Sequence, residues 1–241
     1  MYREAQHLAK RSRDVILLGK ANSRLGHLLM LRGRYEEAMQ FLQIASGLFE
    51  SIDDPLGIAK VYGLLGLLYF RRAKYNQALD YFQRSMETGF SQVGTTNGAE
   101  IVSYLGLTYM NQGEYQQGIE LIKNQIPLHE ANQDSMGLAN LHVNLGIIFF
   151  ESGDDMAAES HFDQGLQLAE ELGNKQLQAI GLGSLGRIFE RRGEYDRAMD
   201  LFKKDLTLCK ELGDWQGIAI AEGLIGELYS LRGKYELAAQ H

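Results

Sequence analysis

The sequence predicts an all-α solenoid of stacked antiparallel helix pairs, and two observations predict it. A Leu-Gly or Ile-Gly pair recurs every 40 residues along the 241-residue chain. The residues shared by the copies follow one another at steps of three and four, which is typical of amphipathic helices and not of strands. A period of roughly 20–50 residues indicates stacked copies of one supersecondary unit. The glycines of the pairs are Gly26, Gly66, Gly106, Gly146, Gly186 and Gly226.

Each copy is expected to hold a first helix, called helix A, and a second, called helix B. In the second copy, helix A should run from about Pro55 to Phe70, because proline suits a first helical turn. A break at Ala73, or at the glycine that replaces it in other copies, then closes this helix. Helix B begins near Tyr75 and ends at a Gly-Asp or Gly-Asn turn, as at Gly213.

Two columns of small residues predict close packing inside a copy. Gly66 and Ala78 lack bulk, so helices A and B can approach closely, and Tyr69 and Phe82 should fill the space between copies. One helix pair cannot bury both of its faces and needs a neighbour on each side. Residues 1–241 are therefore interpreted as one solenoid domain of about five full repeats, with partial repeats at both ends.

These columns resemble the tetratricopeptide repeat, whose signature is Leu-Gly followed by Tyr, Ala and Phe. The usual tryptophan and proline are missing, and the period exceeds the roughly 34 residues of the standard repeat. The long period is similar to that of Pins-type adaptors, kinesin light chains and bacterial signalling proteins. The resemblance implies a right-handed superhelix in which helix A lines the concave side. The matching residues of the second copy are Leu65, Gly66, Tyr69, Ala78 and Phe82.

Composition predicts a cytoplasmic protein without a membrane segment. The net charge is −7 and 45% of residues are hydrophobic, which is ordinary for a soluble chain. No apolar run approaches the roughly 18 residues that span a bilayer, and the N-terminus lacks the apolar core of a signal peptide. A single cysteine excludes an internal disulfide framework and fits a reducing compartment.

Charge is unevenly distributed along the chain. Residues 1–34 hold eight Lys and Arg residues against Glu4 and Asp14, whereas the remainder is acidic. This basic end either attracts an acidic partner or a phosphate, or it is a solvated face of the first helices. Nucleic-acid binding is not expected, because the overall balance is acidic and no motif of interleaved aromatic and basic residues occurs.

Both ends of the sequence fall inside a repeat. Ala5 aligns with Ala45, so the chain begins partway along a helix B, and it stops at His241, early in another helix B. Solenoids usually end in capping helices with a polar outer face. The chain is therefore expected either to be a segment of a longer protein or to associate end to end through its termini.

No motif predicts catalysis, a cofactor or a metal, so an enzyme is not expected. Gly181, Gly183 and Gly186 spell the spacing of a dinucleotide loop, but the segment lies in the middle of a helix A and lacks the required strand. Cys209 is expected to be a buried thiol without a base beside it. The six histidines show no helical metal-ligand spacing. Asp154 precedes a helix B and is interpreted as a cap.

The third copy is irregular. Pro127 falls where other copies continue helix B, and Gly118 replaces the packing alanine. Just upstream, Gly89, Gly94 and Gly98 surround a Thr-Thr-Asn segment. This copy is therefore expected to be the softest, either as a hinge for ligand entry or as a tolerated defect.

A partner-binding groove is expected along helix A. By resemblance, the inward columns include those two before and two, five and six positions after the signature leucine. The columns two and five positions after it carry apolar side chains in copies two to four and charged or polar ones afterwards, so the repeat core does not require either kind. The alternative is that Phe70 and Phe150 fold back onto neighbouring helices. The predicted groove residues are Leu67, Phe70, Arg71, Leu107, Met110, Asn111, Ile147, Phe150, Arg187, Glu190, Arg191 and Glu227.

The sequence therefore predicts a non-catalytic protein–protein interaction scaffold that binds a peptide or a helical segment. A regulatory or sensor segment of a larger, bacterial signalling protein is the alternative, motivated by the unfinished ends. The identity of the partner does not follow from the sequence, because one fold hosts many roles.

Overall fold

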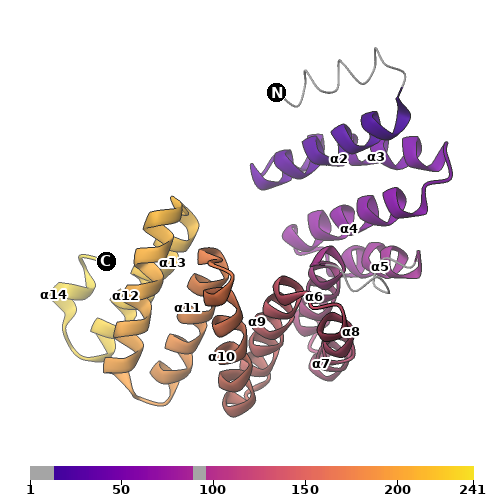
Figure 1. The fold of residues 1–241 in the computed structure, drawn as a ribbon. Coiled ribbons are helices and arrows are strands. Elements are labelled where there is room, and N and C mark those ends of the chain that lie inside the picture. Colours follow the sequence, from indigo (N-terminus) through magenta and orange to yellow (C-terminus); the bar gives the residue numbers. More distant parts are fainter. Residues whose placement is uncertain (1–13, 89–95) are drawn as a thin grey trace. The chain divides into compact units, whose positions relative to one another are not determined.

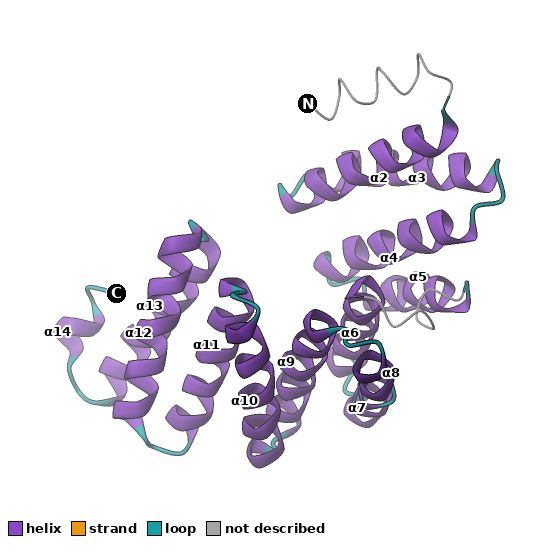
Figure 2. Ribbon diagram, in the orientation of Figure 1, coloured by secondary structure: helices purple, strands orange, loops and turns teal. Residues whose placement is uncertain are grey.

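The structure is a computed structural model that describes residues 14–88 and 96–241, and the chain divides into two compact units, residues 1–114 and 115–241 (Figure 1). The described residues form helices joined by turns and short loops, and no strand occurs among them (Figure 2). The predicted all-α architecture is therefore observed in each unit.

Unit 1, residues 1–114, packs its helices as consecutive pairs. Helix α2 packs against α3, and α4 packs against α5. The pairs contact one another through α3 and α4, and the A helices α2, α4 and α6 are neighbours in that order. The helices are α2 (Val15–Leu31), α3 (Tyr35–Glu50), α4 (Pro55–Arg71), α5 (Tyr75–Glu87) and α6 (Thr96–Asn111).

Unit 2, residues 115–241, repeats the same arrangement. The pairs α9–α10 and α11–α12 form hairpins, and α10–α11 and α12–α13 join successive pairs. Helices α9 and α11, both A helices, also contact each other. The helices are α7 (Tyr115–Lys123), α8 (Ile126–Ala131), α9 (Ser135–Ser152), α10 (Asp155–Glu171), α11 (Lys175–Arg191), α12 (Tyr195–Leu212), α13 (Trp215–Leu231) and α14 (Tyr235–Ala238).

The helix ends follow from local chemistry. Pro55 occupies the first turn of α4, and Asp154 caps α10 by accepting a hydrogen bond from the Ala157 amide at 3.0 Å, as predicted. Gly153 ends α9 with φ 90°, a left-handed conformation that glycine adopts without strain. Ala73 takes the same turn with φ 53°, which costs about 1 kcal/mol relative to glycine.

The repeat glycine makes room for an aromatic side chain of its own copy. A Cβ atom at Gly66 would lie 2.6 Å from the Phe82 ring, and one at Gly146 would lie 2.7 Å from the Phe162 ring. The sequence prediction placed Phe82 between copies. The structure refines it: Phe82 lies against its own helix A and also stacks at 6.4 Å on Tyr104 of the next copy. This column is the core of each helix pair.

The third copy is interrupted where the sequence indicated. Helix α7 ends at Lys123 and α8 begins at Ile126, with Pro127 in the first turn of α8. Proline has no amide hydrogen to donate and disfavours continuation of the preceding turn, which explains the break. Gly89 and Gly94 lie outside the described residues, so the predicted hinge remains a hypothesis.

None of the helices in the described ranges is long and apolar enough to cross a membrane.

Candidate functional site

Each helix A presents one stripe of residues spaced by four, three and four positions, which share a face because a helix turns once every ~3.6 residues. These stripes contain the predicted groove columns two and six positions after the signature leucine. The unit 1 stripe consists of Lys20, Arg24, His27 and Leu31 on α2, Lys60, Leu64, Leu67 and Arg71 on α4, and Glu100, Tyr104, Leu107 and Asn111 on α6. The unit 2 stripe consists of Asn140, Asn144, Ile147 and Glu151 on α9, Ile180, Ser184, Arg187 and Arg191 on α11, and Ile220, Leu224, Glu227 and Leu231 on α13.

A polar cluster joins three helices of the unit 1 stripe. Burial lowers the pKa of His27 below its ordinary value; the carboxylate of Glu100 opposes this shift, and Arg71 adds to it. Burial raises the pKa of the Tyr104 hydroxyl; Glu100 raises it further, and Arg71 opposes the shift. The Arg71 side chain donates a hydrogen bond to the Tyr104 hydroxyl, and His27 and Glu100 lie within electrostatic range of this pair, although the four side chains come from α2, α4 and α6. The cluster offers a neutral imidazole, a neutral phenol, one cation and one anion.

The predicted apolar groove residues of unit 1 lie on α4 and α6, two of the three helices of this cluster. Phe70 is half-buried and meets the rings of Tyr75 at 5.8 Å and Tyr104 at 5.4 Å, edge to face in both cases. Leu107 and Met110 are half-buried. Aromatic pairs in such geometry are worth about 0.5–1.5 kcal/mol beyond their burial, so Phe70 is held in place. The unit 1 face therefore combines a fixed aromatic group with partly exposed aliphatic side chains.

The amide of Asn111 is engaged with its own helix. Its Nδ2 donates to the carbonyl oxygen of Leu107 at 2.8 Å. The side chain is exposed, and its Oδ1 atom remains able to accept a hydrogen bond.

The cations of the unit 1 stripe are exposed and lack acidic partners. Lys20, Arg24, Lys60 and Arg71 are exposed, and none of them forms a salt bridge with another residue of the described ranges. Glu36 pairs with Arg72 at 2.9 Å, beside the stripe and not on it. The stripe therefore presents an excess of positive charge, with four cations and the single carboxylate of Glu100.

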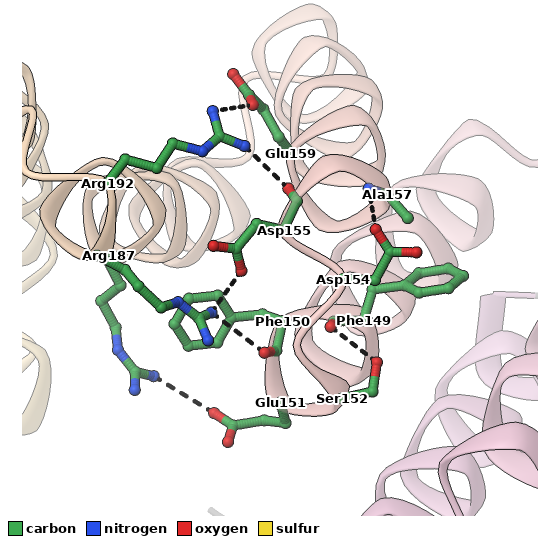
Figure 3. A network of polar contacts seen from close by, with 11 residues as sticks. Phe149, Phe150, Glu151, Ser152, Asp154, Asp155, Ala157, Glu159, Arg187 and Arg192 are labelled. Atoms are coloured by element: carbon green, nitrogen blue, oxygen red, sulfur yellow. Dashed lines mark hydrogen bonds and ion pairs between the residues drawn. The ribbon is translucent and has the colours of Figure 1, made fainter.

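In unit 2, the predicted groove residue Phe150 is covered by arginines of the next helix A. The guanidinium of Arg191 lies 3.7 Å from the ring centroid and that of Arg187 lies 4.6 Å from it. Arg191 also donates to the Phe150 carbonyl at 3.2 Å and pairs with Asp155 at 2.7 Å. Figure 3 shows Phe150, a residue of α9, within this network of polar contacts. Arginine can stack on a ring and pair with a carboxylate at once, because its charge is planar and delocalised.

Arg187 is held more loosely than Arg191. Its guanidinium lies 3.7 Å from Glu151, and both side chains are about half-exposed (Figure 3). An exposed pair at this distance contributes between about 0 and 1 kcal/mol. Both stripe arginines of unit 2 nevertheless have an acidic neighbour, unlike the cations of the unit 1 stripe.

Glu190 is the least satisfied group of the unit 2 face. Its Oε1 atom is buried without a hydrogen-bond partner among the described residues. Burial raises the pKa of this carboxyl, Glu227 raises it further and Arg187 opposes the shift. Glu227 itself is exposed on α13. This face therefore places two carboxyls and one guanidinium within electrostatic range of one another.

The expected exposure of the apolar groove residues needs correction at two positions. Leu67 is only 5% exposed and Phe150 only 9% exposed. The arginines of α11 cover Phe150. Phe70, Leu107, Met110 and Ile147 keep partial exposure, so the apolar surface is smaller than the sequence indicated.

A histidine pair was missed by the sequence analysis. The Nδ1 atoms of His142 on α9 and His161 on α10 lie 3.1 Å apart. The rings stack, and Phe149 stacks on His161. Burial lowers the pKa of His161 to about 4, with the charges of His142 and Lys123 acting in the same direction.

The spacing of 19 residues hid this pair from a search for helical metal spacing, but the repeat columns contain its signal. The same columns hold Tyr62 and Tyr81 in the second copy, and those rings also meet, at 6.0 Å. No group of three or more metal-ligating side chains able to hold a metal ion occurs among the described residues.

Two of the rejected motifs lie where the sequence placed them. Gly183 and Gly186 are in the interior of α11, where Gly186 accommodates the Phe202 ring. Cys209 is 3% exposed, as predicted, and its Sγ donates to Asp205 Oδ1 at 3.2 Å. Burial raises the pKa of this thiol to about 12, so it is not a thiolate near neutral pH.

Solved structures share this fold at low sequence identity. A chain of the APC/C hetero-tetramer Cut9–Hcn1 aligns with all of this chain over 41% of its own length, with a TM-score of 0.77 and 17% identity. A STAND protein with a tetratricopeptide repeat sensor from Pyrococcus horikoshii matches 99% of this chain and 37% of its own, with a TM-score of 0.73 and 15% identity. The structure of NprR in complex with its cognate peptide NprX aligns with 99% of this chain and with 68% of the NprR chain, with a TM-score of 0.69 and 16% identity.

The chain thus spans less than half the length of the first two of these structures. No curated protein sequence matches it. A family model described as tetratricopeptide repeat matches residues 17–88, 99–171 and 137–211, which together make up most of the chain. With the 40-residue period, the capped helix pairs and the glycine–aromatic core, these matches show that the chain belongs to the tetratricopeptide repeat family.

Proposed function

We propose that the chain is a non-catalytic interaction scaffold whose helix A faces bind a peptide or a helical segment of a partner protein. The observation that carries this proposal is the polar and aromatic cluster of His27, Arg71, Glu100 and Tyr104. It gathers hydrogen-bonding groups from three helices beside the half-buried Phe70. Such a surface, with a fixed aromatic group and polar groups around it, is typical of binding sites.

The proposed binding residues fall on both units. Tetratricopeptide repeats are usually non-catalytic interaction modules, and one protein of this fold was solved with its cognate peptide. In unit 1 the proposed binding residues are Phe70, Arg71, Leu107, Met110 and Asn111. In unit 2 they are Ile147, Arg187, Glu190, Arg191 and Glu227. Leu67 and Phe150 belonged to the predicted groove, but both are buried and are therefore left out of the contact surface.

Site-specific photo-cross-linking tests this assignment without destabilising the core. A photoreactive residue at the exposed positions Asn111 or Glu227 should capture a partner from a lysate, and mass spectrometry should identify the same protein from both. Matched control positions are Gln83 and Lys203, which are exposed on helices B. Equal capture from helix A and helix B positions would remove the support for a binding face on helix A.

A regulatory or sensor segment of a larger signalling protein is the second candidate. The P. horikoshii STAND protein carries a tetratricopeptide repeat sensor, and this chain covers 37% of it. The flanking reading frame decides between the candidates. An ATPase, kinase or DNA-binding module in the same frame supports the sensor role, and the absence of any such module supports a free-standing scaffold.

A further inference from the structure

We propose that the unit 1 stripe selects an acidic peptide segment, with Lys20, Arg24, Lys60 and Arg71 binding its carboxylates. This inference rests on the proposed function and names the chemistry of the partner. The four cations share one face of two neighbouring A helices, α2 and α4. The third helix, α6, contributes Glu100 as the one acid of the stripe.

Within the described residues, only Glu100 offsets the positive charge of this stripe. Four exposed cations face one carboxylate, whereas the whole chain carries a net charge of −7. The other basic side chains of unit 1 with assigned partners are Arg34, Arg72 and Arg84, which pair with acids at 2.5 to 3.2 Å. A concentration of unpaired positive charge on an otherwise acidic protein attracts a complementary negative segment and excludes basic ones.

The geometry fits a short peptide. From Lys20 to Leu31 the stripe spans 11 residues of helix, or about 16 Å, at ~1.5 Å per residue. Leu64 and Leu107 are half-buried between the charged positions and offer apolar contact. An acidic peptide with one or two apolar residues would therefore meet both kinds of group at once.

The neutral groups of the stripe add hydrogen bonding without adding charge. Burial lowers the pKa of His27, so its ring is mostly uncharged at neutral pH and can both donate and accept. Burial and Glu100 raise the pKa of Tyr104, so its hydroxyl remains a donor. Together they can contact the backbone of a bound segment, while the cations select its side chains.

A random peptide library displayed on phage tests the inference on the full chain. Selection on the wild-type protein should enrich peptides with an excess of Asp and Glu. A labelled copy of the most enriched peptide should bind about tenfold more weakly at high salt than at low salt, because screening acts on exposed charges. An enriched pool that is neutral or basic overturns the acidic-partner inference and leaves the proposed function standing. Recovery of no peptide contradicts both.

Charge-neutralising variants locate the effect. The double variant Arg24→Gln/Lys60→Gln should bind the enriched peptide about tenfold more weakly, because it removes two of the four cations. The matched control Lys203→Gln/Lys204→Gln changes two exposed lysines of helix B by the same charge and should bind like the wild type. Equal losses in both variants indicate a non-local charge effect and overturn the assignment to this stripe.

Two further probes separate the peptide from other anionic partners. A single-stranded oligonucleotide and a vesicle with anionic headgroups, measured at the same ionic strength, should each bind more weakly than the enriched peptide. Tighter binding of either probe, lost in Arg24→Gln/Lys60→Gln, would replace the peptide with that class of partner. Circular dichroism of every variant confirms that helicity is retained.

Discussion

The unit 1 and unit 2 stripes occupy the same columns of the repeat, but their cations differ in whether they form ion pairs with acidic side chains. Arg71 and Arg191 are equivalent residues, six positions after the signature leucine. Arg191 pairs with Asp155 and stacks on Phe150, whereas Arg71 is exposed without a salt bridge to any described residue. In unit 2 the arginines stabilise the packing of neighbouring helices. In unit 1 the cations of the stripe are exposed, and we propose that they bind a partner.

The comparison shows which columns the fold requires. Gly66 and Gly146 accommodate Phe82 and Phe162 in the same way, so the core is shared by both units. The stripe columns instead hold leucine, arginine, glutamate or asparagine in different copies. Variation in these columns therefore affects contacts between copies and, under our proposal, the choice of partner, and not the formation of the helix pair.

The largest expected effect tests whether the core is shared. Phe82→Ala in unit 1 and Phe162→Ala in unit 2 should each lower the free energy of unfolding by about 3–5 kcal/mol, because each removes a buried ring and leaves a cavity beside glycine. Guanidinium unfolding followed by circular dichroism measures the loss. A loss below about 1 kcal/mol at either position would contradict a common core.

The histidine pair predicts a pH dependence of the stability of unit 2. The pKa of His161 falls from 6.5 to about 4 on folding, so the folded chain binds fewer protons than the unfolded chain between these values. The contribution to stability is complete above pH 6.5 and is lost as the pH falls towards 4. We expect a loss of about 1–2 kcal/mol, which is less than the full shift implies, because solvent screens the partly exposed ring.

A double variant isolates this effect from the carboxylates that also titrate in acid. His142→Tyr/His161→Tyr copies Tyr62 and Tyr81 of unit 1 and should remove the excess pH dependence. Unfolding midpoints of both proteins between pH 4 and 7 measure it. Glu130 and Lys123, the charged groups that act on the pair, remain unchanged. If the unfolding midpoints of the wild type and the variant change with pH in parallel, the histidine pair is not the source of the pH dependence.

The histidine pair also shows how far the sequence could be interpreted. The fold followed from the period, and the break at Pro127 followed from proline chemistry, because both depend on local properties of the backbone. The pair depends on contact between two side chains that are 19 residues apart and lie on different helices. In the sequence, only the equivalent tyrosines of the second copy, Tyr62 and Tyr81, indicate that these two repeat columns meet. Helical periodicity indicates which face a residue shares, but not what covers it.

Phe150 illustrates the same limit for the candidate site. Its column in the repeat predicted an exposed position, since Glu190 and Ser230 occupy that column in later copies. The structure covers its ring with two arginines from the next helix A. Whether such a column is open depends on the length and charge of side chains 40 residues away, which a single copy of the repeat does not contain.

The next largest effect on the free energy of unfolding should distinguish Arg191 from the equivalent Arg71. Arg191→Met should lower the free energy of unfolding by about 1 kcal/mol, since it removes the stacking on Phe150 and the pair with Asp155. Arg71→Met should cost only about 0.5 kcal/mol, because it removes a partly exposed hydrogen bond to Tyr104 and no salt bridge to a described residue. Hydrogen exchange of α9 and α4 peptides resolves the effect by unit. Equal losses would show that Arg71 has a structural role as well.

The smallest expected effect concerns the cations that we assign to binding. Arg24→Gln/Lys60→Gln should leave the free energy of unfolding within a few tenths of a kcal/mol of the wild type, because exposed unpaired charges contribute little to the folded state. Any change should be a slight gain at low salt that disappears at high salt, since removing like charges relieves weak repulsion that salt screens. Thermal unfolding at two salt concentrations measures it. A clear loss of stability would mean that these side chains hold the helices together, as Arg191 does in unit 2, and that their exposure does not mark a binding face.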